Sequence, residues 1–480
     1  MRTSSSLVFK DIIIPLLVFL LGLGIAFVTN SWYFCLLPLI LYVGIISIAH
    51  PRILFYLLFS TLPISITVFI GGSSLELPDE GIAIILTSIA PILLFVYGKD
   101  KFPVFLQPLF IIVLLSIIWI ILLLFTTTNL ALSVKYLIAK LWFTVPMILL
   151  TPLFISKEQH LISVLKILTY ATALVVTPIL IRYALWGFHF SQASAVVDPF
   201  FLNHVAISAF TATILPFIIY YYKKSTPGID KLTALYTILI CLIAGISSYT
   251  RITWLALIAI PFLYFVFKSS WFSKIIYTGI VLCGLSVVYI LENNRYLDYA
   301  PNLEHVIFHD GDIEKHLEAT MDFEDISGVE RLYRWIAAKN SIAQHWIFGT
   351  GPNTFYQEYK KYTERAYSTY VSDNPEKSTT HNQFLLVFFE QGIIGFILFA
   401  GLCIYLLIDS HRLYHTTTFA PMKDILLMLN IALWMIIIHI SVNDLIETDE
   451  IGFIFYFIIG LLLWCRYHIK NKTEATIIES

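Results

Sequence analysis

Long hydrophobic runs separated by short polar segments occupy most of the 480-residue chain. A transmembrane helix needs roughly 20 consecutive apolar residues, so each run of about that length predicts one span. The runs lie near residues 11–29, 32–49, 53–70, 81–97, 102–125, 132–154, 161–184, 203–222, 232–248, 252–267, 272–291, 383–408, 424–441 and 451–466. The pattern therefore predicts an all-α polytopic membrane protein with about 14 transmembrane helices.

The predicted spans divide the chain into three parts. An N-terminal bundle of about 11 helices covers residues 1–291, and about three helices with a polar tail cover residues 383–480. Between them lies a polar loop, residues 292–382, which is much longer than a simple connector and long enough to hold helices. Ser327 and Glu330 have capping-box spacing, so we expect a helix to start there.

Composition and charge agree with a membrane protein and give it an orientation. With 58% hydrophobic and 13% charged residues, too little polar surface remains to cover a water-soluble core. If the N-terminus is cytoplasmic, the inside segments collect most Lys and Arg residues. Two outside loops are acidic instead, one with Glu76, Asp79 and Glu80, the other with Asp444, Glu447, Asp449 and Glu450. We therefore expect both termini in the cytoplasm, the long loop outside, and membrane lipid as a partner.

Two negative findings limit the possible chemistry. All five cysteines fall inside predicted spans, so neither a disulfide framework nor a CxxC metal site is expected. The glycine-rich turn WIFGTGPNTF, residues 346–355, lacks the GxxxxGK[ST] pattern of a phosphate-binding loop. Nucleotide binding is therefore rejected, and no nucleic-acid partner is expected.

The segment STTHNQFLLVFFEQGIIG, residues 378–395, carries the clearest candidate chemistry. Thr379 or Thr380 is predicted to cap a helix whose first turn holds His381 and Asn382. The orphan amides and positive dipole end of such a helix disfavour an imidazolium. We therefore expect a neutral His381 at the membrane surface, available as a general base. Gly392 and Gly395, farther along the same helix, are expected to let another helix approach closely.

Several basic side chains are predicted near the same outer surface. Arg251 lies in a tight outer hairpin, where the orientation rule disfavours it, which indicates an anionic partner or contact with lipid phosphate. Arg331 and Arg334 lie side by side at i and i+3 on an amphipathic helix. Arg182 ends a span on the outer side. Lys135 lies in the outer half of a span, where it either faces a polar cavity or extends to the headgroups.

Three further ionisable residues are candidates of second rank. Lys140 and Glu390 lie at similar depths in their spans, so we predict that they form a pair inside the bundle. The alternative is a protonated Glu390 that bonds to a neighbouring helix. Asp444 is a second candidate for accepting the acceptor proton. His204 follows Asn203 at a helix start and is expected to be structural.

These motifs resemble those of the O-antigen ligase and O-antigen polymerase superfamily. The ligase motif of that superfamily, H[NSQ]-x9-G-x-x-[GTY], is matched by His381-Asn382 followed by Gly392 and Gly395. An outer arginine between two spans and a long loop containing RLYRW agree with the family pattern. One element differs from the family pattern R-x3-L. Arg331 takes the place of its arginine, but Trp335 stands where the pattern has leucine. The resemblance covers mainly residues 240–400.

The resemblance implies a glycosyltransferase at the periplasmic face of a bacterial inner membrane. The donor is a glycan on an undecaprenyl diphosphate carrier, and the acceptor is a sugar hydroxyl of lipid A core in a ligase or of a growing glycan in a polymerase. A transporter or flippase of lipid-linked sugars is the alternative from another class. We find no internal repeat of the kind that such transporters show.

The resemblance also assigns roles to single residues. Arg251 and Arg331 engage the diphosphate and His381 assists the transfer. Further candidates for binding the diphosphate or glycan are Arg182, Arg334, Lys135 and Asn382. Since arginine forks can neutralise a diphosphate and no clear carboxylate metal site is evident, we expect neither a metal nor another cofactor. Direct displacement would invert the anomeric centre.

Overall fold

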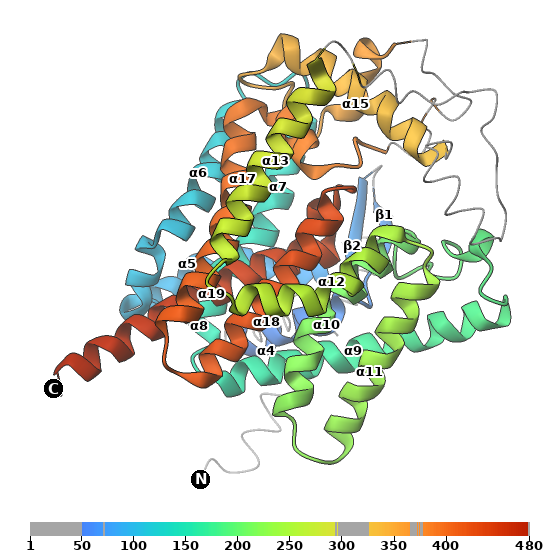
Figure 1. Ribbon diagram of the computed structural model, residues 1–480. Helices are drawn as coiled ribbons and strands as arrows, with labels where there is room; N and C mark the ends of the chain where they lie inside the picture. Colours follow the sequence, from blue (N-terminus) through green and yellow to red (C-terminus); the bar gives the residue numbers. More distant parts are fainter. Residues whose placement is uncertain are drawn as a thin grey trace, which may run out of the picture.

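The computed structural model describes residues 50–70, 73–292, 295, 326–364, 372, 374 and 378–478, and α-helices dominate this part of the chain (Figure 1). The helices before the long loop are α4 (Pro51–Thr61), α5 (Asp79–Tyr97), α6 (Pro108–Leu123), α7 (Leu130–Thr144), α8 (Thr151–Phe154), α9 (Glu158–Leu185), α10 (His204–Lys224), α11 (Ile229–Ser247), α12 (Arg251–Lys268) and α13 (Phe272–Leu291). The later helices are α15 (Ile326–His345), α16 (Phe355–Glu358), α17 (Gln383–Thr416), α18 (Ala420–Ile440) and α19 (Asp449–Ile478).

Shorter elements connect these helices. A π-helix, η4 (Val145–Leu150), joins α7 to α8, so that Leu130–Phe154 forms one apolar segment. The 3-10 helices are η3 (Lys99–Leu106), η5 (Phe190–Gln192), η8 (Tyr359–Tyr362) and η10 (Leu445–Glu447). Strands β1 (Ile66–Ile70) and β2 (Ser73–Leu77) form an antiparallel hairpin in which Ile66 pairs with Leu77.

The all-α polytopic fold predicted from the sequence is confirmed, although the span pattern differs in detail. Within the described residues, ten helices are long and apolar enough to cross a membrane, and Pro108–Leu123 is a shorter apolar helix. The runs near 11–29 and 32–49 lie outside the described residues. The run near 53–70 is not a span, because α4 ends at Thr61 and β1 follows. Pro63 and the β-branched residues after it favour this change from helix to strand.

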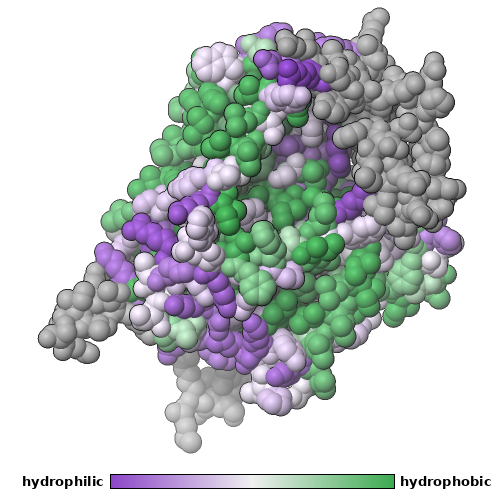
Figure 2. All heavy atoms as spheres, viewed as in Figure 1, coloured by the Kyte–Doolittle hydropathy of each residue, from purple (hydrophilic) through white to green (hydrophobic). Residues whose placement is uncertain are grey.

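The helices divide into a buried centre and a periphery. In α10, α18 and α19, 72–83% of the residues in the apolar segment are buried, against 6% in α13. Figure 2 shows hydrophilic side chains near the end that carries α15 and again toward the opposite end, with a broad hydrophobic region between them. Peripheral helices with exposed apolar side chains suit contact with lipid, since lipid tails impose no cost on apolar surface.

Helix α17 is broken at Gly392, and the break receives the glycine-rich turn of the outer segment. Gly392 has φ 66° and ψ −170°, and a Cβ there would lie 2.0 Å from the Ile347 carbonyl oxygen. The sequence predicts that another helix approaches Gly392, but the turn between α15 and α16 approaches it instead. The prediction fits Gly395, because a Cβ there would lie 3.4 Å from Nε1 of Trp119 on α6.

Three backbone hydrogen bonds fasten this turn to the break. The N–H groups of Thr350 and Gly351 donate to the carbonyls of Phe389 and Glu390, at 3.1 and 2.9 Å. The N–H of Ile393 donates to the Trp346 carbonyl at 2.8 Å. The turn thus replaces the helical hydrogen bonds that α17 loses at Gly392, and it attaches α15 to the bundle.

We predict that Gly392→Ala destabilises the protein by about 2–4 kcal/mol, because Ala is strained at positive φ and its methyl group would overlap the Ile347 carbonyl. The matched control is Gly401→Ala in the same helix, where a Cβ meets nothing within 4 Å. Its effect should be neutral or slightly stabilising. Thermal unfolding of both variants in detergent measures the difference, and equal midpoints would contradict the account of the break.

Candidate active site

His381 lies directly before the first residues of α17. Asn382 caps this helix, since its Oδ1 accepts a hydrogen bond from the Leu385 N–H at 3.0 Å. The predicted cap at Thr379 or Thr380 is therefore wrong, because the helix begins at Gln383 and the Asn382 side chain is the one in register with its third amide. The Thr380 hydroxyl instead accepts from the Asn382 N–H at 3.2 Å.

The backbone of His381 is strained. Its φ is 50°, in the left-handed region that few residues other than glycine adopt. Such a conformation persists only where its surroundings impose it, and it is found disproportionately at functional sites. Here the Thr380 turn precedes His381 and the Asn382 cap follows it. Both contacts fix the direction in which the imidazole leaves the chain.

Asp444 lies beside the imidazole. Its Oδ1 is 3.9 Å from Nδ1 of His381, which is longer than a hydrogen bond, and the two side chains are 24% and 32% exposed. The Asn382 Nδ2 group donates to the Ser441 carbonyl at 2.8 Å and so ties the start of α17 to the segment that carries Asp444. The structure thus places together the first and second candidates for the proton acceptor.

The electrostatic surroundings keep His381 neutral. Burial, followed by the charges of Arg334 and Arg331, lowers the pKa of His381 from its usual 6.5 to about 3. A neutral imidazole is the state expected from the sequence, but the dominant cause is burial beside two guanidinium groups rather than the helix dipole. Burial raises the pKa of Asp444, and the charge of Arg334 partly opposes this effect.

Helix α15 brings its polar face to the segment that precedes His381. Arg334 is buried, and its Nη2 pairs with Glu330 Oε2 at 2.9 Å, while Nη1 donates to the Thr379 carbonyl at 3.4 Å. The indole N–H of Trp335 donates to the Thr380 carbonyl at 2.8 Å. Trp335 stands where the sequence departs from the family pattern. The sequence pattern does not predict its contact with Thr380, the residue before His381. A buried or partly buried indole N–H usually finds a hydrogen-bond acceptor, so a Trp four residues after Arg331 could have indicated such a contact.

Arg251 lies at the same end of the helix bundle as His381. Arg251 is the first residue of α12. Two residues later in the same helix, the hydroxyl group of Thr253 lies 2.9 Å from Nε2 of His439. His439 lies near the end of α18, two residues before Ser441, whose carbonyl binds Asn382. Arg331 and Arg334 act electrostatically on His381 itself, whereas Arg251 is linked to it through α18.

Three other candidates make contacts within the protein. Arg182 donates to the carbonyls of Asp198 and Ala195 at 2.5 and 3.2 Å, and so holds the loop after α9. Lys135 is exposed, and its charge acts on Glu80. Asn382 uses both its amide oxygen and its amide nitrogen for protein contacts. Arg182 and Asn382 thus bind backbone carbonyls of the protein, whereas Lys135 remains exposed.

Part of the chain is similar to a known protein family. Residues 236–400 match a family model described as O-Antigen ligase. This stretch is similar to the O-antigen ligase family. The match runs from α11 to the first half of α17 and includes Arg251, Arg331, Arg334 and His381. It confirms the resemblance to the O-antigen ligase and polymerase superfamily. A search of curated proteins gave no match.

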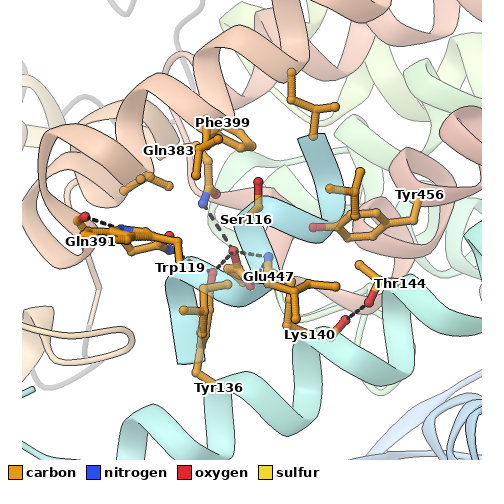
Figure 3. A pocket seen from close by; sticks show the side chains of 17 residues that line it. Ser116, Trp119, Tyr136, Lys140, Thr144, Gln383, Gln391, Phe399, Glu447 and Tyr456 are labelled. Carbon is orange, nitrogen blue, oxygen red and sulfur yellow. Dashed lines mark hydrogen bonds and ion pairs between the residues drawn. The ribbon is translucent and has the colours of Figure 1, made fainter. Parts of the chain in front are cut away.

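A largely buried ion pair between Lys140 and Glu447 lies beside Gln383, the first residue of α17 (Figure 3). The predicted pair between Lys140 and Glu390 is wrong, because Lys140 Nζ lies 2.9 and 3.1 Å from the Glu447 oxygens. Glu390 accepts hydrogen bonds from the N–H groups of Asn353 and Phe355, at 2.8 and 3.0 Å. Equal depth in the membrane does not fix which neighbours meet, and backbone amides at the start of α16 satisfy Glu390 instead.

A small cavity with both polar and apolar lining residues borders this ion pair. Its volume of about 40 Å³ can hold one or two water molecules. Glu447 accepts from the Tyr136 hydroxyl at 3.0 Å and from the Gln383 amide at 3.4 Å. Since Gln383 is the first residue of α17, this network links α7 and the 441–448 segment to the helix that follows His381. The sequence singled out Lys140 but not its partner, although Glu447 lies in one of the two acidic outer loops.

We predict that Lys140→Met destabilises the protein by about 2–4 kcal/mol, because it leaves the Glu447 carboxylate without its cation in a largely buried site. The control is Lys166→Met, which breaks a pair with Asp230 of the same 2.9 Å length but with side chains 47% and 28% exposed. Exposed pairs contribute less than about 1 kcal/mol. Unfolding midpoints in detergent report the contrast, which disappears if burial of the Lys140 pair is unimportant.

Proposed function

We propose that the protein is a glycosyltransferase that moves a glycan from an undecaprenyl diphosphate carrier to a sugar hydroxyl, with lipid A core as the preferred acceptor. The observation that carries this proposal is the cluster of a neutral His381, the guanidinium groups of Arg331 and Arg334, and Asp444. The histidine and both arginines lie inside the residues that match the ligase family. Such a transfer needs a positioned base and cations for the departing diphosphate, and the cluster offers both.

The proposed reaction is a single displacement. The acceptor oxygen attacks the anomeric carbon while the bond from that carbon to the diphosphate oxygen breaks, and the carrier diphosphate leaves. The acceptor proton passes to Nε2 of His381. In this scheme Nδ1 of His381 carries a hydrogen and Asp444 moves closer than the present 3.9 Å to accept it. The resulting hydrogen bond orients the imidazole and stabilises the imidazolium. This direct attack inverts the anomeric centre.

The guanidinium groups have a second effect in this scheme. Burial, together with these charges, holds the pKa of His381 at about 3, which makes the imidazole a weak base. A bound diphosphate would offset the charges of Arg331 and Arg334 and raise the pKa of His381 toward its usual value. Binding of the donor would thereby strengthen the base when it is needed.

Several features support an orientation with the site in the periplasm of a bacterial inner membrane. Arg412 near the end of α17 and Lys423 near the start of α18 lie at the opposite end of α17 from His381. Basic residues favour the cytoplasmic side, so His381 belongs on the other side. The tail after α19 is then cytoplasmic, because α18 and α19 each cross the membrane once after α17. A polymerase that adds repeat units to the same carrier is the second candidate, favoured by the Trp335 departure.

Replacement of His381 by Ala should lower transfer by at least about 100-fold, because it removes the proposed general base. The measurement is transfer by purified protein in detergent, with a carrier-linked glycan and no transmembrane gradient. Product on lipid A core indicates a ligase, and an elongated carrier-bound chain indicates a polymerase.

The matched control for this experiment is His204→Ala. His204 also follows a helix-capping asparagine, Asn203, but its Nδ1 contacts the Ser194 hydroxyl at 2.8 Å in another loop. Transfer by this variant should stay near the wild-type rate. Near-normal transfer by the His381→Ala protein would remove His381 from its proposed role.

Arg331→Lys and Arg251→Lys should each raise KM for the donor about tenfold or more, since a lysine point charge does not reproduce a bidentate guanidinium fork. Steady-state kinetics with varied donor concentration measure the effect. Arg412→Lys serves as control, because Arg412 is exposed at the far end of α17. Wild-type donor affinity in both test variants would rule out the diphosphate clamp.

A further inference from the structure

The two acidic outer loops of the sequence meet in the folded protein. Glu76 at the end of β2, Asp79 at the start of α5 and Asp449 at the start of α19 each offer a carboxylate oxygen, and these oxygens lie within 4.8 Å of one another. Figure 1 shows the beginning of α19 beside β2. The charges of Glu80 and Glu450 also act on Asp449, so five carboxyl groups share one region.

Burial makes this cluster costly as it stands. Asp79 is 0% and Asp449 5% exposed, and Oδ2 of each is buried without a hydrogen-bond partner. Isolated anionic oxygens in such surroundings lose much hydration energy. Two other oxygens are satisfied locally, because Asp79 Oδ1 accepts from the Glu80 N–H at 2.8 Å and Glu80 Oε2 accepts from the Glu76 N–H at 2.7 Å. The unsatisfied oxygens are therefore those left over for a ligand.

Basic side chains do not neutralise the cluster through ion pairs. In the part of the chain that the structure describes, no salt bridge includes Glu76, Asp79, Glu80, Asp449 or Glu450. Lys135 acts on Glu80 only at a distance and is itself exposed. A compact group of carboxylates with this surplus of negative charge needs either protons or a cation.

We propose that Glu76, Asp79 and Asp449 bind one divalent cation and that Ca²⁺ is the ion that fits. Carboxylate oxygens are the ligands that hard cations prefer. Ca–O distances of about 2.3–2.6 Å place opposite ligands up to about 5 Å apart, whereas Mg²⁺ requires about 4 Å and near-ideal octahedral geometry. The three oxygens lie within 4.8 Å of one another, which is inside the range that Ca²⁺ coordination allows. Water and the neighbouring carboxylates of Glu80 and Glu450 complete the coordination.

The cation would act on the architecture of the site. It joins the β1–β2 hairpin and α5 to the first turn of α19, directly after the 441–448 segment. That segment carries Asp444, which lies beside His381, and Glu447, which binds Lys140. A cation at this place therefore fixes the loop that borders the base, while the diphosphate is left to the arginines. The inference does not depend on the proposed transfer reaction.

The test is calcium binding by the purified full chain in detergent after removal of metals with EDTA. Isothermal titration with CaCl2 should show one ion per chain, and saturating CaCl2 should raise the unfolding midpoint by a few degrees. MgCl2 should bind at least tenfold more weakly. If neither ion gives binding heat or a shift of the midpoint, the carboxyl groups are protonated and the proposal is wrong. Tighter binding of Mg²⁺ than of Ca²⁺ would overturn the choice of ion.

Variants connect the binding to these residues. The double change Asp79→Asn with Asp449→Asn should abolish calcium binding, and Glu76→Gln alone should weaken it at least tenfold. Asp198→Asn is the matched control, because Asp198 is an exposed loop carboxylate outside the cluster, and its calcium affinity should equal that of the wild type. Should the double variant fail to fold, Glu76→Gln decides alone. Unchanged affinity in that variant would place the ion elsewhere.

Discussion

Unpaired backbone groups at the break in α17 organise the candidate site. In an apolar environment every backbone N–H and carbonyl group needs a hydrogen-bond partner. The non-helical conformation of Gly392 breaks several hydrogen bonds within α17 and leaves these groups without their usual partners. The turn at residues 346–351 supplies replacements from outside the helix. The Glu390 carboxylate adds two more contacts by accepting the amides of Asn353 and Phe355. The break in α17 is thus the place where the turn between α15 and α16 is attached to the helix bundle.

This attachment also positions the charged groups. Helix α15 is held at its end by the turn in the break and along its length by Arg334 and Trp335, which bond to the carbonyls of Thr379 and Thr380. The same two threonines precede His381. Hydrogen bonds therefore join the helix that carries the guanidinium groups to the residues that precede the imidazole. These bonds fix the distance between the two kinds of group. Fixed geometry of this kind is what reactions between two bound sugars require.

Local patterns in the sequence predicted the fold class and indicated candidate residues for the site, but they did not predict which distant residues would meet. Spacing along one helix was enough to single out Arg331 and Arg334, and the family motif was enough to single out His381. Ion pairs between residues far apart in the sequence could not be predicted in this way. No local pattern indicates that Lys140 pairs with Glu447 rather than with Glu390. The hairpin at 66–77 was missed because its first strand continues an apolar run that reads as a span. The role of Gly392 was misjudged because a motif glycine does not reveal whether a helix or a turn approaches it.

The placement of His381 beside two arginines poses an electrostatic problem that the proposed function resolves. Cations that bind a diphosphate necessarily weaken a nearby base, because they oppose its protonation. Separating the base from the clamp would avoid this conflict but would also move it away from the acceptor hydroxyl, which must reach the carbon next to the diphosphate. The negative donor removes the conflict on binding, since its charge offsets the arginines at the time the proton must move. Asp444 then gains importance, because a protonated His381 needs an anionic neighbour, and this carboxyl group is already 3.9 Å away.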